Sequence, residues 1–281
     1  MYGHVTPSLI GIAMKEMVRR AIKAIRNERF VFDAQAKEHY SGTSEDLVTS
    51  ADKAAQKIYI KAITECFPGY GVIAEEDNLR IPCSLEGKEL YFTVDPLDGT
   101  KAFARRQSTG VGTMIALMRG DEVIAAYVGD VMTQEIYGFR PDSPKAHRIS
   151  EFEISEELTA RARNLKETGY LLLRANPWEC GTNLDALRRF FKGIEVEGGS
   201  IGITFARLWK QEVAALLLQP GYETPWDSAP IIGISRKLGF AFLEAAPDGS
   251  LTETAFPIPR QVTPRPQVVL VIHQSYLEQL R

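Results

Sequence analysis

The spacing of apolar residues changes along the chain, and this change is what most constrains the fold. Residues 7–27 carry apolar side chains every three or four positions, which predicts an amphipathic helix, and a second helix is expected at 50–66 before a Pro-Gly pair. Short apolar runs bounded by turn or charged residues follow, and they predict strands. These runs are 70–74, 90–94, 111–118, 122–129 and 134–139. The segment 119–121 between two of them reads as a hairpin turn, so we expect mostly antiparallel strands in this half.

Beyond a proline-rich break at residues 141–144, helices and strands are expected to alternate. The expected strands are 170–173, 194–196, 213–218, 240–243 and 268–272, and the expected helices are 183–191, 203–209 and 227–238. The whole pattern predicts layered α and β structure, intermediate between the α+β and α/β classes. For 281 residues we expect two parts, an N-terminal α+β part (1–145) and a C-terminal α/β part (146–281).

Charge and composition exclude several classes of protein. Lys and Arg total 33 against 36 Asp and Glu, and this net charge of −3 argues against a general binder of nucleic acid polymers. The longest apolar runs are far shorter than the roughly 20 residues that span a bilayer, so no membrane association is expected. The cysteines, Cys66, Cys83 and Cys180, are odd in number and form no CxxC pair, and no signal peptide is evident. A cytoplasmic protein is therefore expected.

The segment from Asp95 to Thr100, Asp-Pro-Leu-Asp-Gly-Thr, is the most informative for chemistry. An apolar strand runs into two carboxylates, and Asp98-Gly-Thr can open a short helix whose free N–H groups favour an anion. Carboxylates repel a phosphate unless hard divalent cations lie between them, and Mg²⁺ takes such oxygen ligands. The competing interpretation is ordinary turn chemistry, in which Asp-Pro and Asp-Gly pairs are common.

Three further acidic positions could join this site. Glu75 ends an apolar strand, Asp227 begins a helix, and Asp52 lies in the first turn of another helix. Each also has an ordinary structural interpretation: a solvated acidic turn, an N-cap, and a favourable placement at a helix dipole. The polar segment 33–45 reads as a mobile loop, and Lys37 within it is a candidate for a lid over the site.

Taken in order, these motifs resemble the inositol monophosphatase family. The motifs are Val48-Thr49-Ser50-Ala51-Asp52, Ala74-Glu75-Glu76, the Asp95–Thr100 segment and Trp226-Asp227-Ser228-Ala229. The resemblance implies a layered αβαβα sandwich and a Mg²⁺-dependent, lithium-sensitive phosphomonoesterase. It also implies a small phosphorylated polyol, sugar or nucleotide as substrate, and it allows a homodimer.

The resemblance assigns roles to individual residues. Glu75, Asp95 and the Leu97 carbonyl would hold one Mg²⁺, Asp95, Asp98 and Asp227 would hold a second, and a third ion would bind near Glu75. Thr100 and Glu75 would orient and activate the attacking water, and Asp52 would hydrogen-bond Thr100. The expected substrate contacts are Asp98, Gly99, Thr100, Ser200, Gly202 and Thr204.

The substrate end departs from the inositol branch of the family. Members with inositol activity often carry an acidic residue seven positions before the Trp-Asp aspartate, and here that position is Pro220. Lys101 after Thr100 is more similar to the bisphosphate nucleotidase and histidinol-phosphate phosphatase branches. Inositol monophosphate is the first expectation, and a 3′(2′),5′-bisphosphate nucleotidase or a histidinol-phosphate phosphatase is the alternative. A non-catalytic metal- or polyol-binding protein on the same fold is a third hypothesis.

Overall fold

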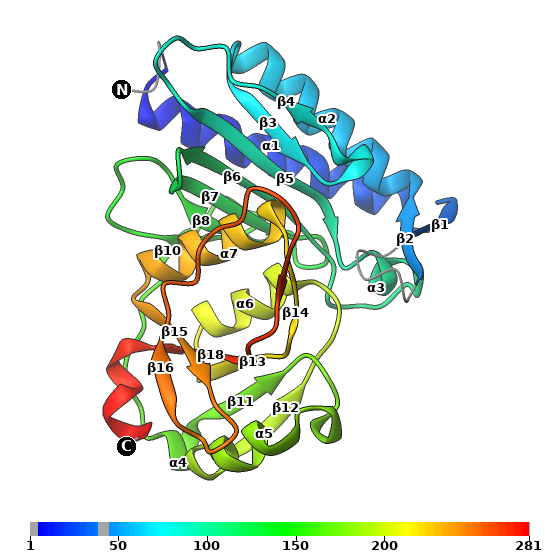
Figure 1. Ribbon diagram of the computed structural model, residues 1–281. Helices are drawn as coiled ribbons and strands as arrows, with labels where there is room; N and C mark the ends of the chain where they lie inside the picture. The colour runs from blue at the N-terminus through cyan, green and yellow to red at the C-terminus, as the bar shows by residue number, and fades with distance from the viewer. Residues whose placement is uncertain (1–4, 39–44, 281) are drawn as a thin grey trace.

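The computed structural model describes residues 5–38 and 45–280. Two long helices, α1 (Pro7–Glu28) and α2 (Ser50–Cys66), form the outer layer on the N-terminal side (Figure 1). Both match the predicted helices within one residue. None of the helices in the described ranges combines the length and the apolar character needed to cross a bilayer.

The second layer is an eight-stranded sheet in the order β10-β9-β8-β7-β6-β5-β3-β4. All neighbours are antiparallel except β3 and β5, which run parallel. The strands are β3 (Gly71–Ala74), β4 (Arg80–Ile81), β5 (Leu90–Asp98), β6 (Gly112–Arg119), β7 (Glu122–Asp130), β8 (Ile136–Phe139), β9 (His147–Ile149) and β10 (Ser155–Glu157).

Helices α6 (Ile201–Trp209) and α7 (Pro225–Lys237) form the middle layer, between the first sheet and a second one (Figure 1). The second sheet has the order β12-β11-β13-β18-β15-β16. Its first three strands are parallel and the others antiparallel. The strands are β11 (Tyr170–Leu173), β12 (Gly193–Val196), β13 (Ala215–Leu218), β15 (Phe240–Ala245), β16 (Leu251–Glu253) and β18 (Val269–His273).

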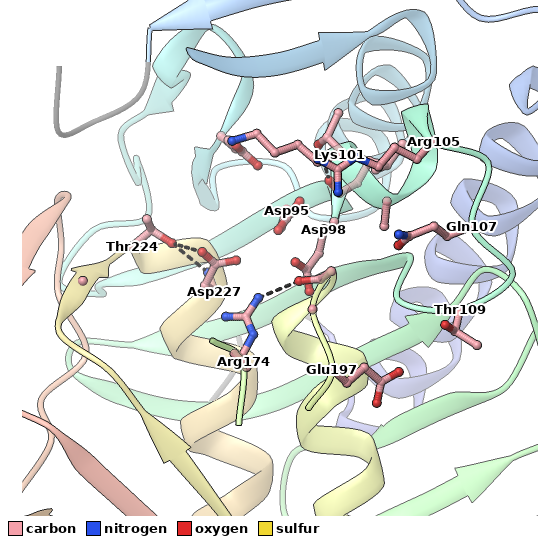
Figure 2. A pocket seen from close by; sticks show the side chains of 18 of the residues that line it. Asp95, Asp98, Lys101, Arg105, Gln107, Thr109, Arg174, Glu197, Thr224 and Asp227 are labelled. Carbon is pink, nitrogen blue, oxygen red and sulfur yellow. Dashed lines mark hydrogen bonds between the residues drawn. The ribbon is translucent and has the colours of Figure 1, made fainter. Parts of the chain in front are cut away.

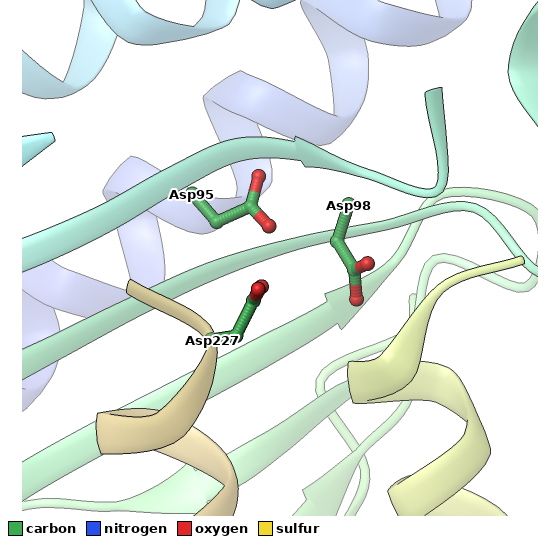
Figure 3. Close-up of side chains that lie close together, drawn as sticks. All are labelled: Asp95, Asp98 and Asp227. Atoms are coloured by element: carbon green, nitrogen blue, oxygen red, sulfur yellow. The ribbon is translucent and has the colours of Figure 1, made fainter. Parts of the chain in front are cut away.

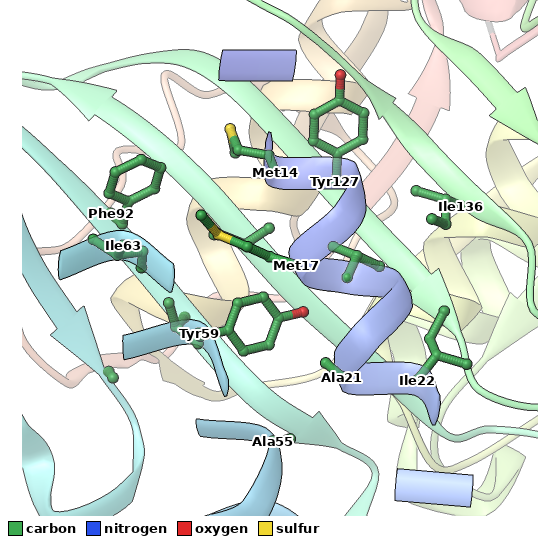
Figure 4. Packing of buried hydrophobic residues seen from close by; sticks show 14 of the residues in the cluster. Met14, Met17, Ala21, Ile22, Ala55, Tyr59, Ile63, Phe92, Tyr127 and Ile136 are labelled. Atoms are coloured by element: carbon green, nitrogen blue, oxygen red, sulfur yellow. The ribbon is translucent and has the colours of Figure 1, made fainter. Parts of the chain in front are cut away.

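The outer face of the second sheet is covered by α4 (Leu165–Thr168), α5 (Gly181–Leu187) and the 3-10 helix η4 (Gln274–Leu280). Three apolar clusters fill the spaces between the five layers. Figure 4 shows the first, where Met14, Met17 and Ala21 of α1 meet Tyr59 of α2 and Phe92 of β5. The αβαβα sandwich expected from the resemblance is confirmed.

The prediction of a loop over residues 33–45 is wrong for its described part. Strands β1 (Ala34–Glu38) and β2 (Glu45–Thr49) pair antiparallel there. Their polar sequences gave no alternating apolar signal, because the pairing lies at the edge of the molecule near α3 (Thr100–Ala104) instead of in the core (Figure 1). The rest of that predicted loop, residues 39–44, lies outside the described residues.

The first sheet continues past the expected boundary at residue 145, since β9 and β10 both belong to it. These short strands, like β14 (Gly221–Glu223), β17 (Thr263–Arg265) and the four-residue α4, were not predicted. Each of these elements has at most one large apolar side chain, so it lacks the apolar run by which strands of similar length, such as β11 and β13, were predicted. The division into 1–145 and 146–281 remains a prediction.

Candidate active site

A bulge in β5 places two carboxylates on the same side of the first sheet. Asp95 pairs with Met114 and Asp98 with Gly112, so β5 has two residues between these pairs where β6 has one. In a regular strand, residues three apart point to opposite faces. The extra residue, at Pro96-Leu97, shifts this alternation, and Asp95 and Asp98 therefore face the same site. Pro96 suits the bulge because it has no N–H to donate to the ladder.

Asp227 in the first turn of α7 completes a cluster of three carboxylates. Thr224 caps this helix, since its Oγ1 accepts from Asp227 N (3.1 Å) and donates to Asp227 Oδ2 (2.7 Å). One carboxylate oxygen from each of Asp95, Asp98 and Asp227 lies within 4.8 Å of the others. Figure 3 shows the three side chains pointing toward one another from β5 and α7.

The cluster fits a hard divalent cation. Asp95 is 2% exposed and Asp98 8% exposed. Burial, followed by the repulsion of the neighbouring carboxylates, raises the pKa of Asp95 well above its usual value and that of Asp227 to about 6. Asp95 Oδ1 is buried and has no hydrogen-bond partner among the described residues. Buried carboxylates of this kind are stabilised by a cation that takes oxygen ligands, and Mg²⁺ is such a cation.

Asp98 is oriented by the start of α6. Its carboxylate accepts hydrogen bonds from Ser200 Oγ, from Ile201 N (3.1 Å) and from Gly202 N (2.7 Å). Ser200 also caps α6, and Thr204 Oγ1 donates to the Ser200 carbonyl (2.8 Å). Ser200 and Thr204 are at most 1% exposed. The geometry therefore gives Ser200, Gly202 and Thr204 a supporting role behind Asp98, and their predicted contacts with substrate remain predictions.

Gly99 connects Asp98 to the short helix α3 in a conformation that favours glycine. It is the N-cap of α3 with a φ of 88°. A Cβ built on Gly99 would lie 2.3 Å from the Gly110 carbonyl oxygen and 2.7 Å from Ser200 N, both of which are backbone atoms. Because any side chain at position 99 would clash with these backbone atoms, the chain can pass the start of α6 only with glycine at this position.

We expect Gly99→Ala to displace both Asp98 and Thr100. The variant should lose most activity, at least about 100-fold in kcat, and lose roughly 2–4 kcal/mol of stability, because a left-handed conformation and a backbone clash act together. Thermal unfolding and phosphate-release assays of the variant would measure both effects. Gly87→Ala is the matched control, since Gly87 also has a positive φ but has open space around it. Equal losses in the two variants would contradict this explanation.

The structure brings Thr100 and Asp52 together, as the resemblance implies. Thr100 Oγ1 lies 3.1 Å from Asp52 Oδ1 and 3.1 Å from the Leu97 carbonyl oxygen. Asp52 is buried and accepts from the N–H (2.7 Å) and the hydroxyl (2.5 Å) of Thr49. Burial raises the pKa of Asp52 to about 6, although the Thr49 hydrogen bonds oppose this. Asp52 is thus both a capping-box residue and the partner of Thr100.

Glu75 lines the same cleft but is engaged by a lysine. Lys37 Nζ of β1 lies 2.9 Å from one carboxylate oxygen of Glu75 and 2.9 Å from one of Glu76. Burial, partly offset by Lys37, raises the pKa of Glu75 to about 8. Burial acts to lower the pKa of Lys37, but Glu75 and Glu76 more than offset this and raise it. Lys37 therefore contacts the predicted site directly, from a strand instead of a loop.

A cleft of about 900 Å³ lies between the first sheet and the ends of the second, and Glu75, Gly99 and Thr100 help to line it (Figure 2). Asp95, Asp98 and Asp227 lie in it, and Arg174 lies on the side opposite Lys101 and Arg105 (Figure 2). Sequence reasoning did not identify Arg174. A signal was present, because this residue directly follows the predicted strand 170–173, just as Asp95 follows 90–94.

The chain resembles known proteins over one third of its length at the sequence level. It is 35% identical over 92 residues to an inositol-1-monophosphatase of Bacillus subtilis, covering 33% of this chain and 34% of that protein. It is 35% identical over 96 residues to the Nus factor SuhB of Vibrio cholerae, covering 34% of each. The matched part thus spans about a third of the length of these relatives.

The fold is similar to solved structures over nearly the whole chain. The extragenic suppressor protein suhB from Bartonella henselae has a TM-score of 0.72 at 18% identity, with 96% of each chain covered. An IMPase/NADP phosphatase complexed with Mg²⁺ and phosphate has a TM-score of 0.68 at 17% identity, with 98% of this chain and 95% of that chain covered. At such identities the likeness concerns the fold. The family model, however, matches residues 8–267, and the chain belongs to the inositol monophosphatase family.

Proposed function

We propose that this chain is a Mg²⁺-dependent phosphomonoesterase that hydrolyses a small phosphorylated compound with a directly attacking water. The observation that carries the proposal is the convergence of three carboxylates on an open cleft, with a buried Asp95 oxygen that lacks a hydrogen-bond partner among the described residues. Two further observations support it. The chain belongs to a family named for a phosphatase, and the similar IMPase/NADP phosphatase structure is complexed with Mg²⁺ and phosphate.

The resemblance to the family assigns the residues that would hold Mg²⁺. Asp95, Asp98 and Asp227, which the structure brings together, would hold one ion. Asp95, Glu75 and the Leu97 carbonyl would hold a second, with a third near Glu75. Bound there, Mg²⁺ supplies neutralisation of phosphate charge, a lowered pKa of water and stabilisation of the leaving oxygen. Lys37 would have to release Glu75 for this carboxylate to serve as a ligand or to accept a proton from water.

Thr100 is suited to orient the attacking water. Its hydroxyl has one hydrogen and two possible acceptors, Asp52 Oδ1 and the Leu97 carbonyl oxygen. When the hydrogen points to the ionised Asp52, the lone pairs of Thr100 Oγ1 can accept a hydrogen from water. Asp52 thus fixes the direction of the Thr100 hydroxyl, which accepts a hydrogen bond from the water but not its proton. Glu75 in the same cleft would take one proton from the water as its oxygen bonds to phosphorus and the bond to the leaving oxygen breaks, and this proton would then pass to the leaving alkoxide, which departs as an alcohol. The N–H groups of Gly99 and Thr100 would face the phosphate.

Substituting Thr100 tests this arrangement. Thr100→Val keeps the shape of the side chain but removes the hydroxyl. We expect kcat to fall about 100- to 1,000-fold while KM changes little, because the hydrogen bond that orients the water acts in the transition state. Thr100→Ser should retain most of the activity. Steady-state kinetics of the two variants give the comparison. A large rise in KM with unchanged kcat would assign Thr100 to substrate binding instead.

The substrate is proposed as a class. Inositol 1-phosphate is the first expectation, and a bisphosphate nucleotide or histidinol phosphate is the alternative. The non-catalytic hypothesis also stays open. Inhibition by lithium, location in the cytoplasm, a homodimer and the lack of nucleic acid binding remain predictions.

Phosphate release tests the proposal. The panel is inositol 1-phosphate, 3′-phosphoadenosine 5′-phosphate, fructose 1,6-bisphosphate and histidinol phosphate, each with Mg²⁺, with EDTA and with lithium added. We expect release that requires Mg²⁺ and favours one compound. A folded protein that binds Mg²⁺ but releases no phosphate from any compound would favour the non-catalytic alternative.

A further inference from the structure

Arg174 lies where the parallel part of the second sheet meets the cleft. The strands β11, β12 and β13 run parallel, and the residues that follow them line the cleft or the cavity beside it: Arg174 after β11, Glu197 to Gly199 after β12, and Gln219 to Glu223 after β13. The carboxyl ends of parallel strands are where α/β sheets bind ligands. This edge faces the three carboxylates from the other side of the cleft (Figure 2).

The guanidinium of Arg174 has one buried donor that the described part of the chain leaves unused. Its Nη2 donates to the Gly199 carbonyl oxygen (2.5 Å), while its Nε is buried and has no hydrogen-bond partner among the described residues. No carboxylate in residues 5–38 and 45–280 forms an ion pair with it within 4.0 Å, although Asp98 and Asp227 are near enough to attract it. A buried donor without a partner is costly, so this group is arranged for a ligand.

The neighbouring charged groups are already paired. Arg265 lies 2.6 Å from Glu223 and donates to the carbonyl oxygens of Gln219 (2.7 Å) and Gln267 (2.5 Å). Glu223 also accepts from Ser228 Oγ (2.5 Å). Glu223, three residues after Pro220, is thus occupied, and it offers little to the hydroxyls of a neutral polyol.

A second cavity adjoins the cleft at Arg174. It measures about 410 Å³, and Pro220 and Arg265 help to line it. It shares five residues with the main cleft: Asp98, Arg174, Gly221, Tyr222 and Asp227. A substrate whose reacting phosphate lies at the carboxylates therefore has space for a further group beside Arg174. The planar fork of a guanidinium matches a phosphate or a carboxylate, and the hydrogen bonds to such anions are strong.

We propose that Arg174 binds a second anionic group of the substrate, so that the cleft selects phosphomonoesters that carry another phosphate or a carboxylate over neutral polyol phosphates. This inference rests on the proposed phosphatase function and specifies its substrate class. It places phosphomonoesters with a second anionic group, such as a bisphosphate nucleotide, ahead of inositol 1-phosphate, the first expectation from the resemblance. Lys101 and Arg105 across the cleft add positive charge and favour the approach of such a substrate.

Matched pairs of compounds test the inference without any variant. The pairs are adenosine 3′-phosphate with 3′-phosphoadenosine 5′-phosphate, fructose 1-phosphate with fructose 1,6-bisphosphate, and glycerol 3-phosphate with 3-phosphoglycerate. The first two pairs differ by a phosphate and the last by a carboxylate. In at least one pair, we expect kcat/KM to be at least tenfold higher for the compound that carries the second anionic group. Ratios near one in all three pairs would overturn the inference.

Variants then assign the preference to Arg174. Arg174→Gln should lower the ratio of kcat/KM between the two compounds of a pair at least tenfold. The change should come mainly from a higher KM for the compound with the second anionic group, and Arg174→Lys should restore part of the ratio. Arg20→Gln, on the exposed face of α1, removes the same charge outside the site and should leave the ratio unchanged. Equal losses for both members of a pair would overturn the inference, since Arg174 would then act on the reacting phosphate or on the carboxylates.

Failure of the phosphatase proposal gives a different result. No compound would then release phosphate, but calorimetric titration of the same pairs would still measure binding. If the compound with the second anionic group binds more tightly, and Arg174→Gln removes this preference, the result would support the subsite even without turnover. Equal binding of both members would overturn it.

Discussion

Asp95→Asn should abolish phosphate release and at the same time stabilise the metal-free protein. Asp95 is proposed to hold two ions, so its loss removes several kcal/mol of transition-state stabilisation, and we expect kcat/KM to fall at least about 1,000-fold. In the absence of metal, burial and the neighbouring carboxylates raise the pKa of Asp95, so folding has to protonate this carboxyl at a cost in stability. The neutral amide of the variant removes that cost and can donate to Asp227. The melting temperature in EDTA should therefore rise by a few degrees.

The opposite signs of these two effects make the result specific. A merely structural aspartate would lose stability when substituted, with or without metal. Thermal unfolding in EDTA and in Mg²⁺, beside the phosphate-release rate, measures both effects. Asp121→Asn is the matched control, because Asp121 is exposed in the β6–β7 turn and pairs only with a surface arginine among its described contacts. Retained activity in Asp95→Asn would contradict the proposed site.

The metal-free protein should lose stability as the pH rises from about 5 to 8.5. Burial raises the pKa of Asp52 and of Asp227 to about 6, and that of Glu75 to about 8. Between the unfolded and folded pKa values the folded state binds more protons, so the free energy of unfolding falls with rising pH. A shift of two units corresponds to roughly 3 kcal/mol, or about 5–10 °C in melting temperature for a chain of this size.

Saturating Mg²⁺ should oppose this loss of stability. A cation favours the ionised carboxylates, and at 100 times its dissociation constant it adds about 2.7 kcal/mol of stability. The added stability should be largest at pH 8.5 and smallest near pH 5. Melting curves at four pH values in EDTA and in Mg²⁺ measure this, and Asp227→Asn should flatten the EDTA profile between pH 5 and 7. A metal-free protein that gains stability over the same range would contradict the account of the cluster.

The long helices and strands could be predicted from the sequence because each is long enough for its spacing of apolar residues to repeat several times. The apolar positions of 7–27 span several helical turns, and all of the expected core positions of α1, from Ile10 to Ile25, are buried. The hairpin of β6 and β7 was equally clear, since two apolar runs enclose a turn. Several short polar strands were missed, and β1 was mistaken for a loop because its sequence carries no apolar run and its first three residues are exposed.

The candidate site was predictable in its composition but not in its geometry. The order of motifs named Asp95, Asp98 and Asp227, which the structure brings together. The bulge at Pro96-Leu97 that makes Asp95 and Asp98 face one cleft depends on the pairing with β6, which the sequence does not show. Arg174 lies in the cleft only because the end of the second sheet packs near the first, so this location could not be predicted from residues 170–174 alone.

The rate of phosphate release as a function of free Mg²⁺ concentration tests the central claim most directly. The substrate would be the best compound of the panel, and the protein would first be freed of metal with EDTA. The account predicts no release without metal, a saturable rise with Mg²⁺, and no rise in Asp95→Asn at any concentration. Release that is unchanged by EDTA, or that rises equally in Asp95→Asn, would contradict the assignment of metal-dependent hydrolysis to this carboxylate cluster.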